Sequence, residues 1–227
     1  MKPFVSINTA VTADGKMDTY ERRGSAISSA KDKLRVDRLR AEADAVMVGG
    51  RTLIGEDPKL TVKSEALRAE RVARGRTPNP MKVGIVTNAD DLRDGDFIHF
   101  GAARVVIFTT EQTSKVQVEF LRSRNVDVYI HNTPRVDLVK ALRTLSELGA
   151  KRLMVEGGGT LNFELLRLGL VDELTMYVAP MIFGGESAPT AAAGSGVARG
   201  EAIPLRLVKS EVFDEEGGVL LHYSLKL

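Results

Sequence analysis

Short hydrophobic runs alternate with longer amphipathic segments along most of this chain. In Phe4–Ala10 the apolar residues first occupy alternate positions, whereas Ala45–Val48 is a continuous apolar run that Gly49-Gly50 ends. Both patterns are typical of strands. Four further β-prone runs predict strands at Lys82–Val86, Arg104–Phe108, Val126–Ile130 and Arg152–Val155.

Two amphipathic segments predict helices. The first has Ser28 or Ser29 as its cap and runs through Leu34, Leu39 and Ala43. The second has an apolar residue at every third position, at Val136, Val139, Leu142, Leu145 and Leu148. Thr133 is its expected N-cap, Pro134 fits its first turn, and Gly149 would end it. Strands that alternate with helices of this length predict βα units and a mostly parallel sheet.

The last quarter of the chain has a different pattern. Strands are predicted at Glu173–Val178, Leu205–Phe213 and Val219–Lys226, with no long helix between them. Glu215–Gly218 has the composition of a turn, so the last two strands form a β-hairpin. Gly184–Gly200 is rich in Gly, Ala and Ser and is expected to be a surface loop.

These elements predict one fold class and one domain. No internal repeat or linker divides the sequence, so residues 1–227 are expected to form a single domain. The predicted fold is α/β and three-layered, with a mostly parallel sheet, helices on both faces and antiparallel C-terminal strands.

Composition narrows the possible functions. The 227 residues include no cysteine, which excludes a Cys nucleophile, thiolate zinc sites and iron–sulfur clusters. With 32 Lys+Arg against 30 Asp+Glu, the net charge of +2 argues against a nucleic-acid binder, and the basic stretch Arg68–Arg76 is expected to be a solvated helix face. The three histidines share no metal-ligand spacing, so no metal site is predicted.

Membrane and secretion signals are not found in the sequence. The longest stretch without a charged residue has 12 residues, whereas a spanning helix needs about 20 apolar residues. The N-terminus also lacks the pattern of a secretion signal. An intracellular, cytoplasmic protein with no membrane partner is therefore expected.

The sharpest chemical feature is the segment Leu153–Leu161, in which an apolar strand enters three glycines and then a helix that Thr160 is expected to cap. Glycines let backbone N–H groups approach a phosphate, and a helix N-terminus adds free donors and partial positive charge. The segment matches neither the G-x-G-x-x-G fingerprint nor the P-loop, and a plain tight turn is an alternative. Glu156 favours a site, because α/β sheets bind ligands at the carboxyl ends of their strands.

A second glycine turn, Gly49-Gly50, follows another strand and suggests a second wall of a cleft. If the next turn is helical, Thr52 and Glu56 stand four residues apart on one face. Pro58 disfavours helix at the preceding residue and would leave the Asp57 carboxylate at the helix end. The alternative is that Thr52 and Asp57 only cap their own turns.

The segment Thr12–Lys16, just after the first strand, is the third candidate. It fits either a polar turn with Gly15 at positive φ or a loop that folds over a ligand.

Taken together, these segments resemble the reductase family of riboflavin biosynthesis, which has a dihydrofolate-reductase-like fold. Thr12–Lys16 is similar to the family's S-L-D-G-K/R loop, Leu39–Ala41 to its L-R-A helix, and Val48–Thr61 to its V-G-x-x-T…D-D-P-x-L-T segment. Val155–Leu161, followed by Leu170–Glu173 and Ala179-Pro180, is similar to V-E-G-G-x-x-L…L-V-D-E…A-P. The resemblance extends from about Phe4 to Leu227, with the motifs in the family's order.

The resemblance implies a reaction and a set of site residues. The family uses NADPH, for which NADH is the alternative, to reduce the ribose of a ribosylamino-pyrimidinone 5′-phosphate to a ribityl chain. The implied cofactor contacts are Ala10, Thr52, Glu56, Asn88, Gly158, Gly159, Thr160 and Leu161. The implied substrate contacts are Arg40, Leu60, Lys63 and Glu156.

Two carboxylates are the candidate catalytic groups for this reaction. Glu156 would hydrogen-bond the pyrimidine and stabilise positive charge at the imine of the ring-opened sugar. Asp57 is the candidate proton relay, a role that requires a tuned pKa.

Three positions depart from the family's pattern. The family usually has Asp where Glu56 stands, bacterial members often have Trp where Ala26 stands, and Lys63 replaces a common Arg and so loses a bidentate fork. Bacterial members are typically fused to a zinc deaminase, which needs a P-C-x-x-C site that this sequence lacks. The chain therefore resembles the stand-alone archaeal and fungal type, whose substrate is 2,5-diamino-6-ribosylamino-4(3H)-pyrimidinone 5′-phosphate.

Two other functions stay open. One is a dihydropterin or dihydrofolate reductase on the same fold, and the other is a non-catalytic NADP-binding module. Glu156 and Asp57, which are costly to bury without a purpose, favour an enzyme. Resemblance also implies a homodimer, for which Leu170–Met181 and the C-terminal hairpin offer apolar strand surface. The central prediction is that the triple-glycine bend and Gly49–Asp57 line one crevice that holds a nicotinamide dinucleotide.

Overall fold

The computed structural model describes residues 2–24 and 26–225 of the chain. These residues divide into two compact units. Among the described residues, the first unit consists of residues 2–3 and Asp37–Met154, and the second of residues 4–24, 26–36 and 155–225. Each unit has its own set of paired strands.

The first unit is built on parallel strands. Their order is β5-β4-β3-β2, followed by β6, most of which belongs to this unit. The pairs β2–β3, β3–β4 and β4–β5 are all parallel. Their bounds are Ala45–Gly49 for β2, Met81–Ile85 for β3, Val105–Thr110 for β4, Val126–His131 for β5 and Arg152–Val155 for β6. Every residue of β2 and β4 is buried, as continuous apolar runs require in a sheet covered on both faces.

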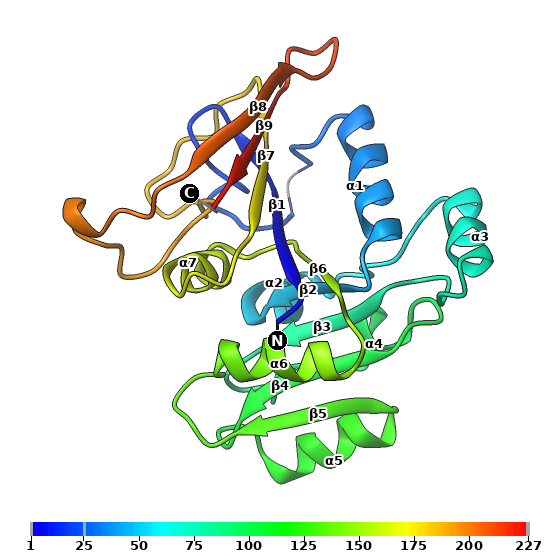
Figure 1. The fold of residues 1–227 in the computed structure, drawn as a ribbon. Helices are drawn as coiled ribbons and strands as arrows, with labels where there is room; N and C mark the ends of the chain where they lie inside the picture. Colours follow the sequence, from blue (N-terminus) through cyan, green and yellow to red (C-terminus); the bar gives the residue numbers. More distant parts are fainter. Residues whose placement is uncertain (1, 25, 226–227) are drawn as a thin grey trace. The chain divides into compact units, whose positions relative to one another are not determined.

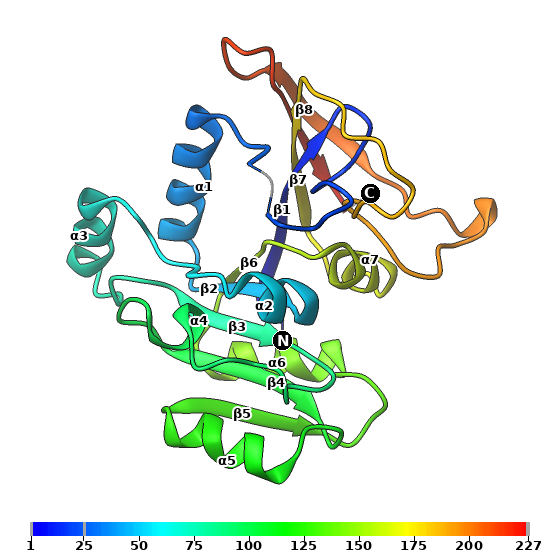
Figure 2. The ribbon, with the colours of Figure 1, turned by 180° about the vertical axis from the view of Figure 1, so that it is seen from behind.

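Helices cover both faces of the first unit's sheet. The chain moves outward from β2 to β5 and then returns to β6, so right-handed crossovers place the last helix on the face opposite to the earlier ones. In Figures 1 and 2, α6 and α2 accordingly lie on opposite sides of these strands. The helix bounds are Gly50–Glu56 for α2, Glu65–Ala73 for α3, Asp96–His99 for α4, Lys115–Ser123 for α5 and Leu138–Glu147 for α6.

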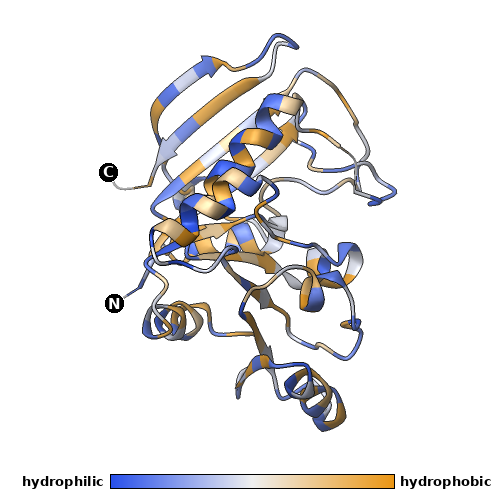
Figure 3. Ribbon diagram, turned by 90° about the vertical axis from the view of Figure 1, so that its right-hand side faces the viewer, coloured by the Kyte–Doolittle hydropathy of each residue, from blue (hydrophilic) through white to orange (hydrophobic). Residues whose placement is uncertain are grey.

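The second unit combines one parallel pair with an antiparallel hairpin. Strand β1 (Phe4–Thr12) pairs in parallel with β7 (Glu173–Ala179), and β9 (Val219–Ser224) is antiparallel to both β7 and β8 (Arg206–Val212). In Figure 3, the strands of the hairpin carry both hydrophobic and hydrophilic residues. Helix α7 (Gly159–Arg167) and a short 3₁₀ helix (Arg199–Glu201) belong to this unit, and α1 (Ala30–Glu42) begins in it.

The structure confirms the α/β class, the mostly parallel strands and the antiparallel C-terminal strands. Each predicted strand is present within two residues of its expected ends, except that Lys226 lies outside the described residues. Helix α5 was not expected. Its N-cap Ser114 accepts a hydrogen bond from the Gln117 N–H, a local pattern that sequence periodicity alone did not isolate. The single-domain count stays a prediction.

Three local predictions are wrong. Asp137, not Thr133, caps α6, because its side chain accepts the Lys140 N–H at 3.0 Å, and Pro134 therefore precedes the helix instead of lying in its first turn. Thr160 lies inside α7, whose N-cap is Gly158. The basic stretch is not wholly solvated either, since Arg71 is buried; its guanidinium binds three backbone carbonyl oxygens, those of Ala41, Ala43 and Thr77, at 2.7–2.9 Å. Among the described residues, no helix has the length and hydrophobicity to cross a membrane.

Candidate active site

The carboxyl edge of the first unit's sheet carries the second glycine turn. Strand β2 passes directly into α2 at Gly50, where an added Cβ would lie 3.0 Å from Cγ2 of Val86. The start of α2 therefore packs closely on the end of β3. Thr52 lies in the first turn of this helix, and Asn88 follows β3 by three residues. Because β2 and β3 are parallel, the structure brings the elements that carry Thr52 and Asn88 to the same edge.

Helix α2 places its other predicted residues at its end. The predicted helical spacing of Thr52 and Glu56 is present, and Glu56 is the last residue of the helix. Asp57 follows in the left-handed region, with φ 46° and ψ 58°. Its two carboxylate oxygens accept the backbone N–H groups of Asp96 at 2.7 Å and Phe97 at 2.8 Å. Asp57 is thus the C-cap residue of α2, and its carboxylate binds the start of α4.

The buried Lys82 side chain binds the opposite end of α4. Its ammonium donates to the carbonyl oxygens of Phe97 at 3.0 Å and Phe100 at 2.6 Å. Burial lowers the pKa of Lys82 to about 8 against the opposing effect of the nearby Asp96 and Asp57 carboxylates. An acid at the N-terminus and a base at the C-terminus both suit the helix dipole. Lys82 lies within a hydrophobic strand, and no feature of the sequence indicated that it would bind α4.

The three substrate residues predicted in the first unit lie on connected elements. Arg40, on α1, donates from Nη1 to the carbonyl oxygen of Thr61 at 3.1 Å. Leu60 is buried and has φ 49°. The N–H of Lys63 donates to Asp37 at 2.6 Å. The structure therefore brings the end of α1 and the segment that carries Leu60 and Lys63 together.

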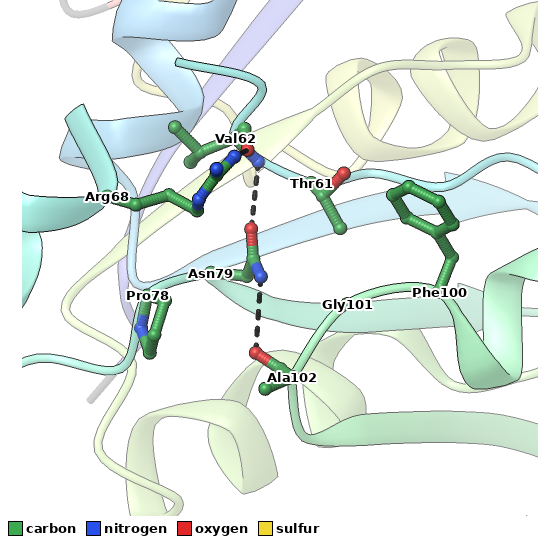
Figure 4. Close-up of a pocket in the computed structure, with 8 residues that line it drawn as sticks. All are labelled: Thr61, Val62, Arg68, Pro78, Asn79, Phe100, Gly101 and Ala102. Atoms are coloured by element: carbon green, nitrogen blue, oxygen red, sulfur yellow. Dashed lines mark hydrogen bonds between the residues drawn. The ribbon is translucent and has the colours of Figure 1, made fainter. Parts of the chain in front are cut away.

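A shallow pocket of about 350 Å³ lies nearby but contains none of the predicted site residues (Figure 4). Asn79 forms its centre: its side chain accepts the Val62 N–H at 3.0 Å and donates to the Ala102 carbonyl at 3.3 Å. Asn79 precedes β3 and Ala102 precedes β4, so the pocket is at the amino edge of these strands. Ligands of parallel α/β sheets bind at the carboxyl edge instead.

The triple-glycine bend follows β6 and starts α7 in the second unit. Glu156, half-buried, is the first residue after the strand, and the peptide bond between Gly157 and Gly158 is cis. Gly158 caps α7 without any side-chain hydrogen bond. The first hydrogen bond of the helix is donated by Asn162 to the Gly158 carbonyl at 3.1 Å. The preceding N–H groups of the first turn therefore have no acceptor within the helix.

Gly159 lies against an irregular segment, Pro189–Ala193. An added Cβ at Gly159 would lie 2.2 Å from the Thr190 carbonyl oxygen, and the Ala193 N–H donates to the Gly159 carbonyl at 3.0 Å. Only glycine permits this approach of two backbones.

Two loops meet where β1 and β7 end. Gly15 has the predicted positive φ of 79°. The Asp14 carboxylate accepts the N–H groups of Phe183 at 3.2 Å and Gly184 at 2.7 Å and also the Thr12 hydroxyl, which holds the pKa of Asp14 below its usual value. Asp14 thus ties the Thr12–Lys16 loop to the loop after β7, a role that sequence analysis missed although the Asp-Gly pair marked the turn.

Ala10 also lies near this end of the second unit. It is opposite Tyr177 in the β1–β7 register and packs on the cluster of Ile27, Tyr177, Ala179 and Leu220. The structure therefore places Ala10 two residues before the carboxyl end of β1.

The residues of the second unit fit an anionic cofactor group. The N–H groups of Gly159, Thr160 and Leu161 have no acceptor among the described residues, and with glycines that allow close approach they are suited to a diphosphate. In the part of the chain that the structure describes, no group of three or more His, Asp or Glu side chains could hold a metal ion. The two glycine turns belong to different units, so their predicted convergence on one crevice stays a prediction.

Comparisons with known proteins give consistent matches. The family model of the RibD C-terminal domain matches residues 3–218. A 2,5-diamino-6-ribosylamino-4(3H)-pyrimidinone 5′-phosphate reductase from Methanothermobacter thermautotrophicus is 38% identical over 227 residues and covers 100% of both chains. Its namesake from Archaeoglobus fulgidus is 37% identical over 86% of this chain and 88% of that protein. A pyrimidine reductase-like protein from Corynebacterium diphtheriae has the same fold, with a TM-score of 0.80, 19% identity and coverage of 98% and 91% of the two chains.

Proposed function

The chain belongs to the RibD C-terminal domain family, and we propose that it is the reductase of 2,5-diamino-6-ribosylamino-4(3H)-pyrimidinone 5′-phosphate in riboflavin biosynthesis. The observation that carries this proposal is the 38% identity to a reductase of that name over the whole of both chains. The product carries a ribitylamino group in place of the ribosylamino group.

NADPH is the proposed cofactor, with NADH as the alternative. When bound, it supplies a hydride from nicotinamide C4 to C1′ of the ring-opened sugar imine. The N–H groups of Gly159, Thr160 and Leu161 are proposed to bind its diphosphate, since they are donors at a helix N-terminus. Ala10, Thr52, Glu56, Asn88 and Gly158 remain proposed cofactor contacts.

The proposed roles of the two carboxylates differ. Glu156 orients the pyrimidine and stabilises the positive charge of the imine, because it directly follows a strand at the glycine bend. Asp57 uses both oxygens to bind the start of α4. It acts as a proton relay only if one of these bonds is released, and we therefore propose that its main role is to hold α4. Arg40, Leu60 and Lys63 are proposed to face the sugar phosphate, for which a guanidinium and an ammonium are suited.

The test is an assay of NADPH oxidation by the purified protein with three substrates. We expect oxidation with the diamino ribosylaminopyrimidinone phosphate and slower or no oxidation with its deaminated counterpart or with dihydrofolate. Faster turnover of dihydrofolate would overturn the proposed substrate. Binding of NADPH without turnover of any substrate would instead indicate the non-catalytic module.

A homodimer is also proposed, through one face of the second unit's strands. Val178, Val219 and Val212 are opposite one another on β7, β9 and β8 and so share a face, and Val212 is 76% exposed. A charged residue on this face would oppose association, whereas one on the other face would not. We expect Val212→Asp, which introduces a charge on this face, to halve the mass measured by light scattering. Glu211→Gln changes the charge of the other face and should leave the mass unchanged. A wild-type protein that is monomeric at micromolar concentration would refute the dimer.

A further inference from the structure

The amide of Asn162 lies behind the glycine bend of the second unit. Asn162 is 1% exposed and lies in the first turn of α7. Its backbone N–H donates to the Gly158 carbonyl at 3.1 Å, and its side-chain Nδ2 donates to the Ala191 carbonyl at 2.9 Å. One residue therefore links the bend, the helix and the irregular segment Pro189–Ala193.

The side-chain oxygen of this amide has no hydrogen-bond partner among the described residues. This atom, Oδ1 of Asn162, is buried. Buried polar atoms without partners are rare in folded proteins, and each calls for a physical explanation. A leucine of similar size would bury no polar atom, so the packing of α7 alone does not require an asparagine here.

The segment that Asn162 holds has few other attachments to α7. The Ala193 N–H donates to the Gly159 carbonyl at 3.0 Å, and on its other side the segment is held by the N–H of Met17, which donates to the Pro189 carbonyl at 2.8 Å. The close contact of Gly159 with Thr190 requires the two backbones to keep their relative position. The Nδ2 bond is the one side-chain hydrogen bond among these attachments.

We propose that Asn162 is a positioning residue for the nicotinamide cofactor: its amide fixes Thr190–Ala193 against the glycine bend and so sets the direction of the first N–H groups of α7. This inference rests on the proposed function, because it assumes that those N–H groups bind the cofactor's diphosphate. Asn162 itself is buried and acts through the backbone of the bend. A small displacement of the donors weakens every hydrogen bond to a phosphate, because these bonds depend steeply on distance and angle.

The test compares Asn162→Leu with a matched control, Asn79→Leu. Asn79 is also buried, at 4% exposure, and its side chain also binds backbone groups, but in the first unit. We expect Asn162→Leu to raise the dissociation constant for NADPH about tenfold, the value of one hydrogen bond, with turnover at saturating NADPH and the KM of the pyrimidinone substrate within about twofold of wild type. Asn79→Leu should lower the Tm and leave the NADPH dissociation constant unchanged.

A second variant covers the case in which Asn162→Leu does not fold. Ala193→Pro removes the N–H that binds Gly159 from the side of the segment and leaves the buried face of α7 intact. It should raise the NADPH dissociation constant in the same way. A folded Asn162→Leu or Ala193→Pro protein that binds NADPH as tightly as wild type would overturn the inference while the proposed function stands. A wild-type protein that binds neither NADPH nor NADH would overturn both.

Discussion

The turn between β2 and α2 and the bend between β6 and α7 both join a buried strand to a helix through glycine, but they pack against different kinds of structure. Gly50 packs on Val86, at the end of the neighbouring strand. Gly159 packs on the carbonyl of Thr190, in a segment without regular structure. The first turn is therefore supported by its own sheet, whereas the second depends on a loop that must be held in place by specific contacts.

The two regions also differ in the surroundings of their carboxylates, Asp57 and Glu156. Asp57 directly follows α2, and both of its carboxylate oxygens accept backbone N–H groups of α4. Glu156 enters the glycine bend half-buried. This contrast predicts that the first carboxylate contributes mainly to stability and the second mainly to turnover, and four experiments can break or sharpen the comparison.

The largest effect is expected for Glu156→Gln. The substitution keeps the size of the side chain but removes the charge proposed to stabilise the imine. Loss of one such electrostatic interaction costs about 10²-fold in kcat, and the dissociation constant for NADPH should stay within about twofold. Steady-state kinetics and fluorescence titration measure the two quantities. An equal loss of turnover and NADPH affinity would contradict the role assigned to Glu156.

Gly159→Ala should weaken NADPH binding more than Gly50→Ala does. A Cβ at Gly159 meets a backbone oxygen at 2.2 Å, whereas a Cβ at Gly50 meets a valine methyl at 3.0 Å. A methyl group can move, but moving the Thr190 carbonyl displaces the whole segment. Overpacking of this kind costs about 1–3 kcal/mol, so we expect about a tenfold rise in the dissociation constant for Gly159→Ala and about twofold or less for Gly50→Ala. The same rise for both would remove the difference between the two turns.

Asp57→Ala should destabilise the protein, because the first N–H groups of α4 lose their acceptor. Loss of an N-cap costs about 0.5–2 kcal/mol, and two bonds place the expected value near the upper end. Asp137→Ala, which removes a single cap bond from α6, is the matched control and should cost less. Urea denaturation gives both values. If Asp57→Ala unfolds at the wild-type midpoint but loses turnover, Asp57 is the proton relay after all.

The regular elements of both units could be predicted from sequence because their signals are local. Continuous apolar runs gave β2 and β4, and the spacing of leucines gave α6. The cap of α6 was misplaced because Thr133 and Asp137 are both good cap residues, and only the packed structure selects between them. Arg71 looked solvated because its partners are carbonyl oxygens at the end of another helix, which leave no mark in the charge pattern.

The candidate site was predictable to a smaller extent. The glycine turns, the left-handed Gly15 and the place of Asp57 after a helix all follow from residue type and position. Asp57, Asp14 and Asn162 each bind a backbone group that lies 29 to 170 residues away in the chain. Such long-range contacts depend on how loops pack, and hydrophobic periodicity contains no information about them.

The smallest expected effect concerns the other end of α4, where Lys82 should make the free energy of unfolding depend on pH. Its pKa is about 8 in the folded protein because of burial, against an ordinary value of 10.5. Between these pH values the unfolded chain binds more protons than the folded one, so the free energy of unfolding should rise with pH, by about 1 kcal/mol from pH 8 to about pH 9. Below about pH 7 the contribution should be constant. Lys82→Met lacks the group, so the difference between wild-type and Lys82→Met unfolding curves at each pH isolates this contribution. A difference that does not change over this range would show that the buried ammonium keeps its ordinary pKa, and that its bonds to the Phe97 and Phe100 carbonyls offset the loss of water.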